Sequence, residues 1–328
     1  WSTVCCVISC AIKTSCWPMR RRITRHSNRH PPMTLRINCR HGSAESYVEV
    51  LQASGRGAKV LGGAAVRLDV PCNVRDLPGF AEGQVSVQDF GAQQAALRLD
   101  VADGMRVLDA CAAPGGKSGH LLELADIELT ALDIDATRLE RVAENLSRLK
   151  LNATLAAADA AKPDSWWDGK PFDRILADVP CSASGVVRRN PDIKWLRRPE
   201  DFAALGLQQA AMLDALWPLL ASGGKMLYAT CSIMPEENQQ QLDAFLKRHG
   251  DALSVSSSAI TALPVAIVSP SVVCRKITSH AMRRLLLSAV LLAGRCWILR
   301  TGRRQSNSSC AAAYGWSWIS ASCRGRSS

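Results

Sequence analysis

The pattern of apolar and polar residues predicts alternating strands and helices through the middle of the chain. Short apolar runs predict strands, whereas longer segments with apolar residues every three or four positions predict helices. The predicted strands after residue 100 are 105–109, 128–133, 153–157, 172–178 and 225–230. The predicted helices among them are 136–149, 203–220 and 235–248, and the first is amphipathic. Regular alternation of this kind indicates an α/β fold with a doubly wound parallel sheet.

A different pattern precedes this sheet. Residues that alternate in polarity predict strands over 31–38, 65–70 and 84–88, and Thr34, Arg36 and Asn38 share one face of the first strand. A helix is predicted over 43–53, with Ser43 as its N-cap. The sequence therefore predicts a small α+β module at 29–88, followed by the α/β domain at 89–251.

The first strand of the α/β domain ends in Asp109 and leads into a loop of small residues before the next helix. This loop consists of Cys111, Ala112, Ala113, Pro114, Gly115, Gly116 and Lys117. In α/β proteins such a strand–loop–helix unit often binds a nucleotide-like ligand. The dinucleotide motif G-x-G-x-x-G is absent, and the phosphate-binding motif G-x-x-x-x-G-K-[ST] lacks its first glycine because Cys111 occupies that position. The small residues of this loop would let its backbone come close to a flat ligand, which is the interpretation favoured here. The alternative is an ordinary turn between a strand and a helix.

Acidic residues stand at the ends of the following strands. Asp133, Asp159 and Asp178 each end a predicted strand, where open parallel sheets bind their ligands. Asp133 comes 24 residues after Asp109, close to the spacing of an acid that binds ribose hydroxyls. Asp159 could accept a hydrogen bond from an adenine amino group. Acids at successive strand ends, without a phosphate loop, favour a nucleoside ligand that lacks phosphate, such as S-adenosylmethionine. Taken alone, each acid could also be a helix cap or a loop residue.

Two cysteines follow the last two predicted strands of the sheet. Cys181 lies in the segment Asp178-Val-Pro-Cys-Ser, and Cys231 lies in Tyr228-Ala-Thr-Cys-Ser. Neighbouring parallel strands end at the same edge of a sheet, so both thiols are expected near one pocket. A single buried cysteine usually acts as a small hydrophobic residue, so the interpretation depends on the pair.

Together, these motifs resemble the RNA cytosine-C5 methyltransferases. The segments Pro235-Glu-Glu-Asn238 and Arg188-Arg-Asn-Pro-Asp-Ile-Lys-Trp195 are similar to those of the Sun/Fmu-type group, the bacterial ribosomal RNA small subunit methyltransferase B enzymes. The resemblance covers residues 29–250. It implies a Rossmann-like class I methyltransferase sheet, S-adenosylmethionine as methyl donor and a cytidine of 16S ribosomal RNA as acceptor.

The resemblance also implies a role for each site residue. The loop 111–117 with Asp133, Asp159 and Asp178 would bind the donor, and Asp178 is also the candidate acid or hydrogen-bond partner for cytosine N3. Cys231 would be the nucleophile that adds to cytosine C6, and Cys181 would be the thiol that assists release. Transfer RNA as the acceptor, and an inactive RNA-binding remnant of such an enzyme, remain alternatives.

A basic segment around Trp195 is the candidate RNA contact. Its members are Arg188, Arg189, Lys194, Trp195, Arg197 and Arg198. Cations that bind phosphates and an aromatic ring that stacks on a base would explain this composition, with a solvated loop around one buried tryptophan as the alternative. A local basic patch is needed because residues 45–251 hold 29 acidic and 22 basic residues, a net charge of −7, although the whole chain carries +11.

The excess positive charge lies in the two ends of the chain. Residues 1–44 hold 8 basic residues and residues 252–328 hold 10, and neither segment contains an acidic residue. Folded domains ordinarily carry charges of both signs. We therefore expect 1–28 and 252–328 to be non-native or disordered, produced by out-of-frame translation around an authentic core.

Two features usual in the resembled group are not recognised: an N-terminal all-helical RNA-binding domain and a closing antiparallel strand after residue 251. We therefore expect strand 225–230 to lie near an exposed edge of the sheet and the chain to have weak or absent activity.

The remaining signals indicate a cytoplasmic monomer that binds neither membrane nor metal. Cysteines 39, 72, 111, 181 and 231 are widely spaced and form no C-x-x-C motif. The apolar stretch 285–299 is short for a membrane span and is interrupted by Gly294 and Arg295.

Overall fold

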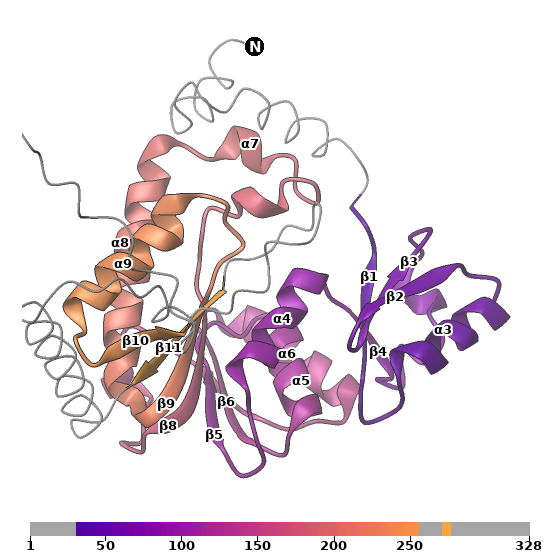
Figure 1. Ribbon diagram of the computed structural model, residues 1–328, viewed down its shortest axis with the longest axis horizontal. Helices are drawn as coiled ribbons and strands as arrows, with labels where there is room; N and C mark the ends of the chain where they lie inside the picture. The colour runs from indigo at the N-terminus through magenta and orange to yellow at the C-terminus, as the bar shows by residue number, and fades with distance from the viewer. Residues whose placement is uncertain (1–30, 256–270, 277–328) are drawn as a thin grey trace, which may run out of the picture. The chain divides into compact units, whose positions relative to one another are not determined.

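The computed structural model describes residues 31–255 and 271–276, which form the small module and the α/β domain (Figure 1). The module is a four-stranded antiparallel sheet in the order β2-β3-β1-β4, with one helix. Its elements are β1 (Thr34–Ile37), α3 (Ala44–Ala53), β2 (Ala58–Gly62), β3 (Ala65–Leu68) and β4 (Val85–Val87). Strand β2 was not predicted, because its short sequence is flanked by glycines and shows no clear alternation.

Helix α3 covers one face of the module's sheet. Leu35 and Val66 alternate with polar neighbours along their strands and pack with Tyr47 and Leu51 of α3 in one apolar cluster. The helix begins after Ser43, as predicted. The Ser43 hydroxyl accepts a hydrogen bond from the Ser46 backbone N–H at 3.2 Å, and the Ser46 hydroxyl accepts one from the Ser43 N–H at 3.2 Å. This reciprocal cap satisfies backbone donors that the first helical turn leaves without partners.

The α/β domain contains a seven-stranded sheet in the order β10-β11-β9-β8-β5-β6-β7. Its strands are β5 (Arg106–Asp109), β6 (Glu128–Asp133), β7 (Thr154–Ala157), β8 (Phe172–Asp178), β9 (Leu220–Ala229), β10 (Ala252–Val255) and β11 (Ser271–Lys276). Its helices are α4 (Phe90–Leu99), α5 (Gly116–Leu124), α6 (Ala136–Leu149), α7 (Ile193–Leu196), α8 (Pro199–Leu216) and α9 (Gln239–Arg248). Strands β5 to β9 are parallel to one another, as predicted.

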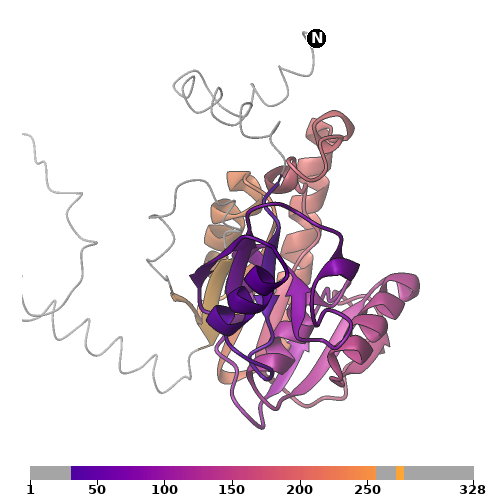
Figure 2. The same ribbon diagram turned by 90° about the vertical axis from the view of Figure 1, so that its right-hand side faces the viewer.

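Helices cover both faces of this sheet (Figures 1 and 2). Helices α4, α5 and α6 contribute Leu99, Leu121 and Leu146 to an apolar cluster on one face. Helices α8 and α9 contribute residues such as Leu213 and Phe245 to a second cluster on the other face. The carboxyl ends of β5, β6, β8 and β9 therefore open at one edge between two packed helical layers. None of the helices in the described part of the chain is long and apolar enough to cross a membrane.

Two predicted helices differ from the structure at their starts. Helix α8 begins at Pro199, where proline at the first helical position and the acids Glu200 and Asp201 suit a helix N-terminus. The helix predicted at 235–248 is instead a 3₁₀ turn (Pro235–Glu237) followed by α9, with a break at Asn238. The Asn238 side chain donates to the backbone oxygens of Ser232 and Met234, at 3.0 Å and 2.8 Å. These bonds bring the turn back onto the loop after β9.

The expectation of an exposed edge at strand 225–230 is wrong. Strand β11 pairs antiparallel with β9, from Ser271 opposite Ala229 to Arg275 opposite Lys225, and β10 pairs antiparallel with β11. The β-branched residues of β11 favour an extended strand, and Cys274 is buried in the apolar cluster beneath α8 and α9. The unusual composition of the tail concealed this short segment. Residues 1–28, and 252–328 apart from 252–255 and 271–276, lie outside the described residues.

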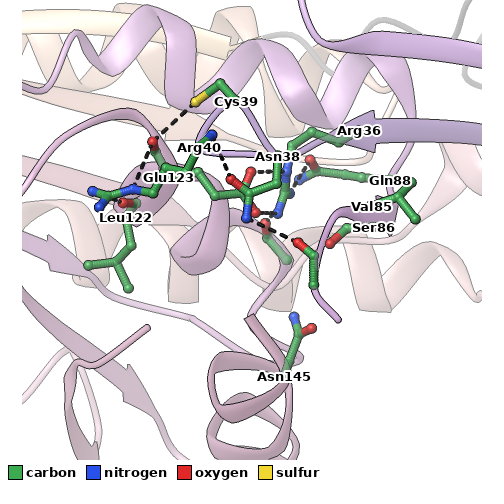
Figure 3. A network of polar contacts seen from close by, with 12 residues as sticks. Arg36, Asn38, Cys39, Arg40, Val85, Ser86, Gln88, Leu122, Glu123 and Asn145 are labelled. Atoms are coloured by element: carbon green, nitrogen blue, oxygen red, sulfur yellow. Dashed lines mark hydrogen bonds and ion pairs between the residues drawn. The ribbon is translucent and has the colours of Figure 1, made fainter. Parts of the chain in front are cut away.

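A buried polar network joins the module to the α/β domain (Figure 3). The Arg36 guanidinium on β1 forms two hydrogen bonds to the Glu123 carboxylate on α5, at 2.8 Å and 2.7 Å. It also donates to Gln88 Oε1 at 2.6 Å and to the Gly116 carbonyl at 2.7 Å. Arg36 and Glu123 are almost fully buried. The polar face predicted for the first strand is therefore a docking face, and it contacts the residue at which α5 begins.

Candidate active site

A cavity of about 690 Å³ opens at the carboxyl ends of β5, β6, β8 and β9. Its volume lies within the range of pockets that hold nucleoside-sized ligands. Of the predicted site residues, the lining includes Cys111, Ala113, Lys117, Asp133, Asp159, Asp178, Cys181, Arg188, Arg189 and Cys231. Among the described side chains, the lining does not include Ala112, Pro114, Gly115 and Gly116, which belong to the loop, or Trp195, Arg197 and Arg198.

The small-residue loop is held against the end of β6. The Ala113 N–H donates to Asp133 Oδ2 at 3.2 Å, and the Asp133 carboxylate forms an ion pair with Arg138 at 3.4 Å. Gly115 has a φ of +92°, and a β-carbon there would lie 3.1 Å from Val142 Cα. Glycine is therefore required by both the backbone conformation and the close approach of α6. The loop presents backbone and small side chains to the cavity.

Three strand-end acids line the cavity, and each lies beside a cation. Asp133 pairs with Arg138, Asp159 with Lys162 and Asp178 with Lys117. Ile134 follows Asp133, is 70% exposed, and also lines the cavity. An exposed isoleucine offers an apolar surface for the face of an adenine ring. Ile134 was not among the predicted site residues, although it directly follows a strand-end acid in the sequence.

Lys117 and Asp178 form an ion pair inside the cavity, with Nζ and Oδ2 2.5 Å apart. Burial alone would lower the pKa of Lys117, but the Asp178 charge and hydrogen bond raise it above its ordinary value. Lys117 therefore remains protonated at neutral pH. Its positive charge also favours ionisation of the Cys231 thiol.

The structure brings together the two predicted cysteines. Cys181 and Cys231 lie 3.2 Å apart, sulfur to sulfur, and the Cys231 N–H donates to Cys181 Sγ at 3.3 Å. The hydrogen bond from the Cys231 thiol lowers the pKa of Cys181 below its ordinary value, and the same contact raises the pKa of Cys231. The pair therefore loses its first proton readily and its second with difficulty. A proton shift across the 3.2 Å contact can move the single negative charge from Cys181 to Cys231.

This coupling predicts the pH dependence of thiol alkylation. In the wild-type chain, Cys181 should react with iodoacetamide at a pH below the ordinary thiol range, because its thiolate is stabilised. Cys231→Ala removes the donated hydrogen bond, so the reaction profile of Cys181 should move to higher pH. Peptide mass spectrometry across a pH series measures the profile. Cys72→Ala, in the small module, is the control and should leave it unchanged. An unshifted profile in Cys231→Ala would refute the coupling.

A buried carboxylate behind the thiols holds their two loops together. Glu237 is fully buried and accepts hydrogen bonds from the Ser182 N–H at 2.7 Å and the Ser182 hydroxyl at 2.5 Å. The Ser232 hydroxyl also donates to it, and Gln209 donates from α8 at 3.1 Å. Ser182 and Ser232 directly follow Cys181 and Cys231. Glu237 therefore fixes the relative position of the two thiols. Glu237 lies in the segment 235–238 that carries the family resemblance, but no role was predicted for it from the sequence.

The residues predicted to contact RNA do not all lie in the cavity, and their contacts differ from one residue to the next. Arg189 lines the cavity and forms an ion pair with Asp89. Arg197 donates to the Ser182 carbonyl at 2.9 Å, so it supports the Cys181 loop. Trp195 is 68% exposed, which differs from the buried tryptophan of the alternative interpretation. The Arg198 backbone N–H donates a hydrogen bond to the Asp201 carboxylate at 2.9 Å, at the start of α8. The side chain of Lys194 lies outside the described part of the structure.

Family models match both the small module and the α/β domain of the chain. The family model described as 16S rRNA methyltransferase RsmB/F matches residues 96–275, more than half of the chain. A second model, described as the ferredoxin-like domain of RsmF/B-like methyltransferases, matches residues 15–75. This match begins inside the segment that was expected to be non-native.

Curated relatives agree with these models. The chain is 52% identical over 241 residues to ribosomal RNA small subunit methyltransferase B of Pseudomonas syringae pv. tomato, covering 72% of this chain and 54% of the relative. It is also 52% identical over 234 residues to the enzyme of that name from Serratia proteamaculans, covering 70% and 54%. The predicted resemblance to the Sun/Fmu-type group is confirmed. The chain spans about half the length of the curated relatives it matches.

Solved structures support the fold. A methyltransferase homolog protein from Pyrococcus horikoshii has a TM-score of 0.67 and 27% identity, covering 80% of this chain and 92% of that one. NSun6 from Pyrococcus horikoshii has a TM-score of 0.68 and 19% identity, covering 80% and 95%, and supports the fold alone. The predicted class, a Rossmann-like methyltransferase sheet preceded by a small α+β module, is confirmed.

Proposed function

Because the chain belongs to the 16S rRNA methyltransferase RsmB/F family, we propose that it methylates cytosine C5 in 16S ribosomal RNA through a covalent cysteine adduct. The observation that carries this proposal is the Cys181–Cys231 contact at 3.2 Å, in the same cavity as the small-residue loop and the strand-end acids. A base that reaches these thiols would also face a donor bound by the loop. An RNA methyltransferase that attacks a ring nitrogen or a ribose hydroxyl has no need of two thiols in contact.

We assign the donor site to S-adenosylmethionine. Loop 111–117 would contact it through backbone atoms, Asp133 would accept hydrogen bonds from the ribose hydroxyls, and Ile134 and Asp159 would contact the adenine. When bound, this molecule supplies an electrophilic methyl group.

The chain's own residues would activate the cytosine. Cytosine C5 is a poor nucleophile, and addition of the Cys231 thiolate to C6 makes C5 electron-rich. Asp178, in its protonated form, would donate a hydrogen bond to N3 and pass that proton to N3 as the S–C6 bond forms. After C5 accepts the methyl group, loss of the C5 proton to a base allows the S–C6 bond to break. N3 then returns its proton to the Asp178 carboxylate and the aromatic ring is restored. Cys181 lies close enough to Cys231 to assist this release.

The acceptor must leave its base stack to meet the thiols, so a cytidine in a loop or bulge is expected. The test offers 16S ribosomal RNA and transfer RNA separately with a methyl-labelled donor and analyses the digested RNA for 5-methylcytidine. Label in 16S ribosomal RNA as 5-methylcytidine supports the proposal. Label in transfer RNA alone would assign the alternative acceptor, and labelled RNA without 5-methylcytidine would refute the chemistry.

A further inference from the structure

The module's sheet has a second face, opposite α3, with two parts. The inner part docks on the α/β domain, where Arg36 contacts Glu123 (Figure 3). The outer part is a row of three residues on adjacent strands. Lys59 on β2 lies opposite Arg67 on β3, and Arg67 lies opposite Thr34 on β1. Residues directly opposite in antiparallel strands share a face, with β-carbons about 5 Å apart.

This row places two positive charges side by side without a counter-charge. Like charges directly opposite one another destabilise a strand pair. Lys59 is exposed and Arg67 is half-buried, and neither forms an ion pair within the described residues. Asp69, which directly follows β3, forms no ion pair with either of them. In contrast, Arg36 and Arg189 nearby are each paired with an acid. The row therefore has the composition of an anion site.

The row faces the active-site cavity. Thr34, Lys59 and Arg67 line it, together with Leu61, which is half-buried and lies two residues after Lys59 on the same strand. The opposite side of the cavity contains Asp133, Asp159 and Asp178. These acids are paired with Arg138, Lys162 and Lys117, so within the described residues the charges on that side are compensated, whereas the wall formed by the module carries unpaired positive charge. A polyanion whose base reaches Cys231 would lie against the basic wall.

We propose that Lys59 and Arg67 bind an RNA phosphodiester next to the target cytidine, with Leu61 in contact with the adjoining ribose or base. This inference rests on the proposed function, since it assumes that RNA enters the cavity. The small module would then position the acceptor strand, in addition to supporting the α/β domain. Phosphate contacts of this kind fix the register of the strand and carry no base preference.

The experiment measures binding of a 16S ribosomal RNA transcript to full-length Lys59→Gln, Arg67→Gln and double variants, all in a Cys231→Ala background that prevents covalent capture. The double variant should bind roughly tenfold or more weakly, and the slope of log affinity against log salt should fall by about 0.7, since the two side chains share one phosphate and each phosphate contact on a single strand contributes about 0.7. Lys247→Gln on α9 makes the same charge change on an exposed lysine away from the cavity and is the matched control.

Thermal unfolding separates binding from folding. Removal of one of two opposed cations should leave the melting temperature unchanged or higher, so weaker binding without destabilisation supports the site. The inference is overturned if the double variant binds with the affinity and salt slope of Lys247→Gln. The exposed Lys59→Gln variant gives the same readout if the double variant folds poorly.

Adduct formation by the chain with native Cys231 on 5-fluorocytidine RNA is measured in parallel. Its absence would refute the proposed function, whereas its presence with unchanged binding would refute this inference alone.

Discussion

Cys231→Ala is expected to lower methyl transfer roughly a thousandfold or more, because loss of a covalent nucleophile removes the step that activates C5. It should also abolish the covalent complex with RNA that contains 5-fluorocytidine. Fluorine at C5 cannot leave as a proton, so the S–C6 bond persists after methyl transfer and the complex survives a denaturing gel. Cys181→Ala should behave differently. Its adduct should form and then accumulate even on unmodified RNA, because release loses its assisting thiol.

Comparison of the Cys231→Ala and Cys181→Ala variants identifies which thiol is the nucleophile. The pKa of Cys181 is lowered by the hydrogen bond from Cys231, so the negative charge of the free pair lies first on Cys181. If Cys181 were the nucleophile, its alanine variant would lose the adduct and Cys231→Ala would keep it. Such a reversal would contradict the assignment, as would an adduct that survives in both variants. Cys72→Ala, in the small module, is the matched control and should react as the wild-type chain does.

The sequence predicted the parts of the site that depend on local pattern. The bounds 128–133 and 136–149 agree with β6 and α6, because an apolar strand and an amphipathic helix each have a clear period. The strand-end position of Asp133 and Asp178 followed from those strands. The contact between the two thiols followed from the adjacency of β8 and β9 at one edge of the sheet.

The parts that were missed depend on contacts between distant residues. Arg36 shares a polar face with its neighbours, and nothing local indicates that its partner is Glu123, 87 positions later. Glu237 looks like a helix-start acid until the loop after β8 places Ser182 against it. Strand β11 lies in a segment of atypical composition, and its pairing with β9 depends on backbone hydrogen bonds that composition does not reveal. Local periodicity thus predicted the strands and helices. It could not predict which polar residues, distant in the sequence, form hydrogen bonds or ion pairs with one another.

Glu123→Ala is expected to lower the free energy of unfolding by about 3–5 kcal/mol, because it leaves the buried Arg36 guanidinium without its counter-charge. His120 adds no second positive charge nearby, since burial and the Arg36 charge lower its pKa to about 3. Urea denaturation of the single variants and of Arg36→Met/Glu123→Met measures the coupling. The double variant should be more stable than Glu123→Ala, because neither charge remains buried alone.

The exposed pair Arg40–Asp126, with Nη2 and Oδ1 2.6 Å apart, supplies the matched control. The Asp126 side chain is 80% exposed, so Asp126→Ala should cost less than about 1 kcal/mol. A cost for Glu123→Ala as small as this would contradict the expected role of the buried pair. Arg36 also holds the carbonyl of Gly116, which belongs to loop 111–117, the proposed donor-binding loop. The stable double variant should therefore still bind the methyl donor more weakly than the wild-type chain, as equilibrium titration would measure. Unchanged donor affinity would mean that the module stabilises the α/β domain without shaping its donor site.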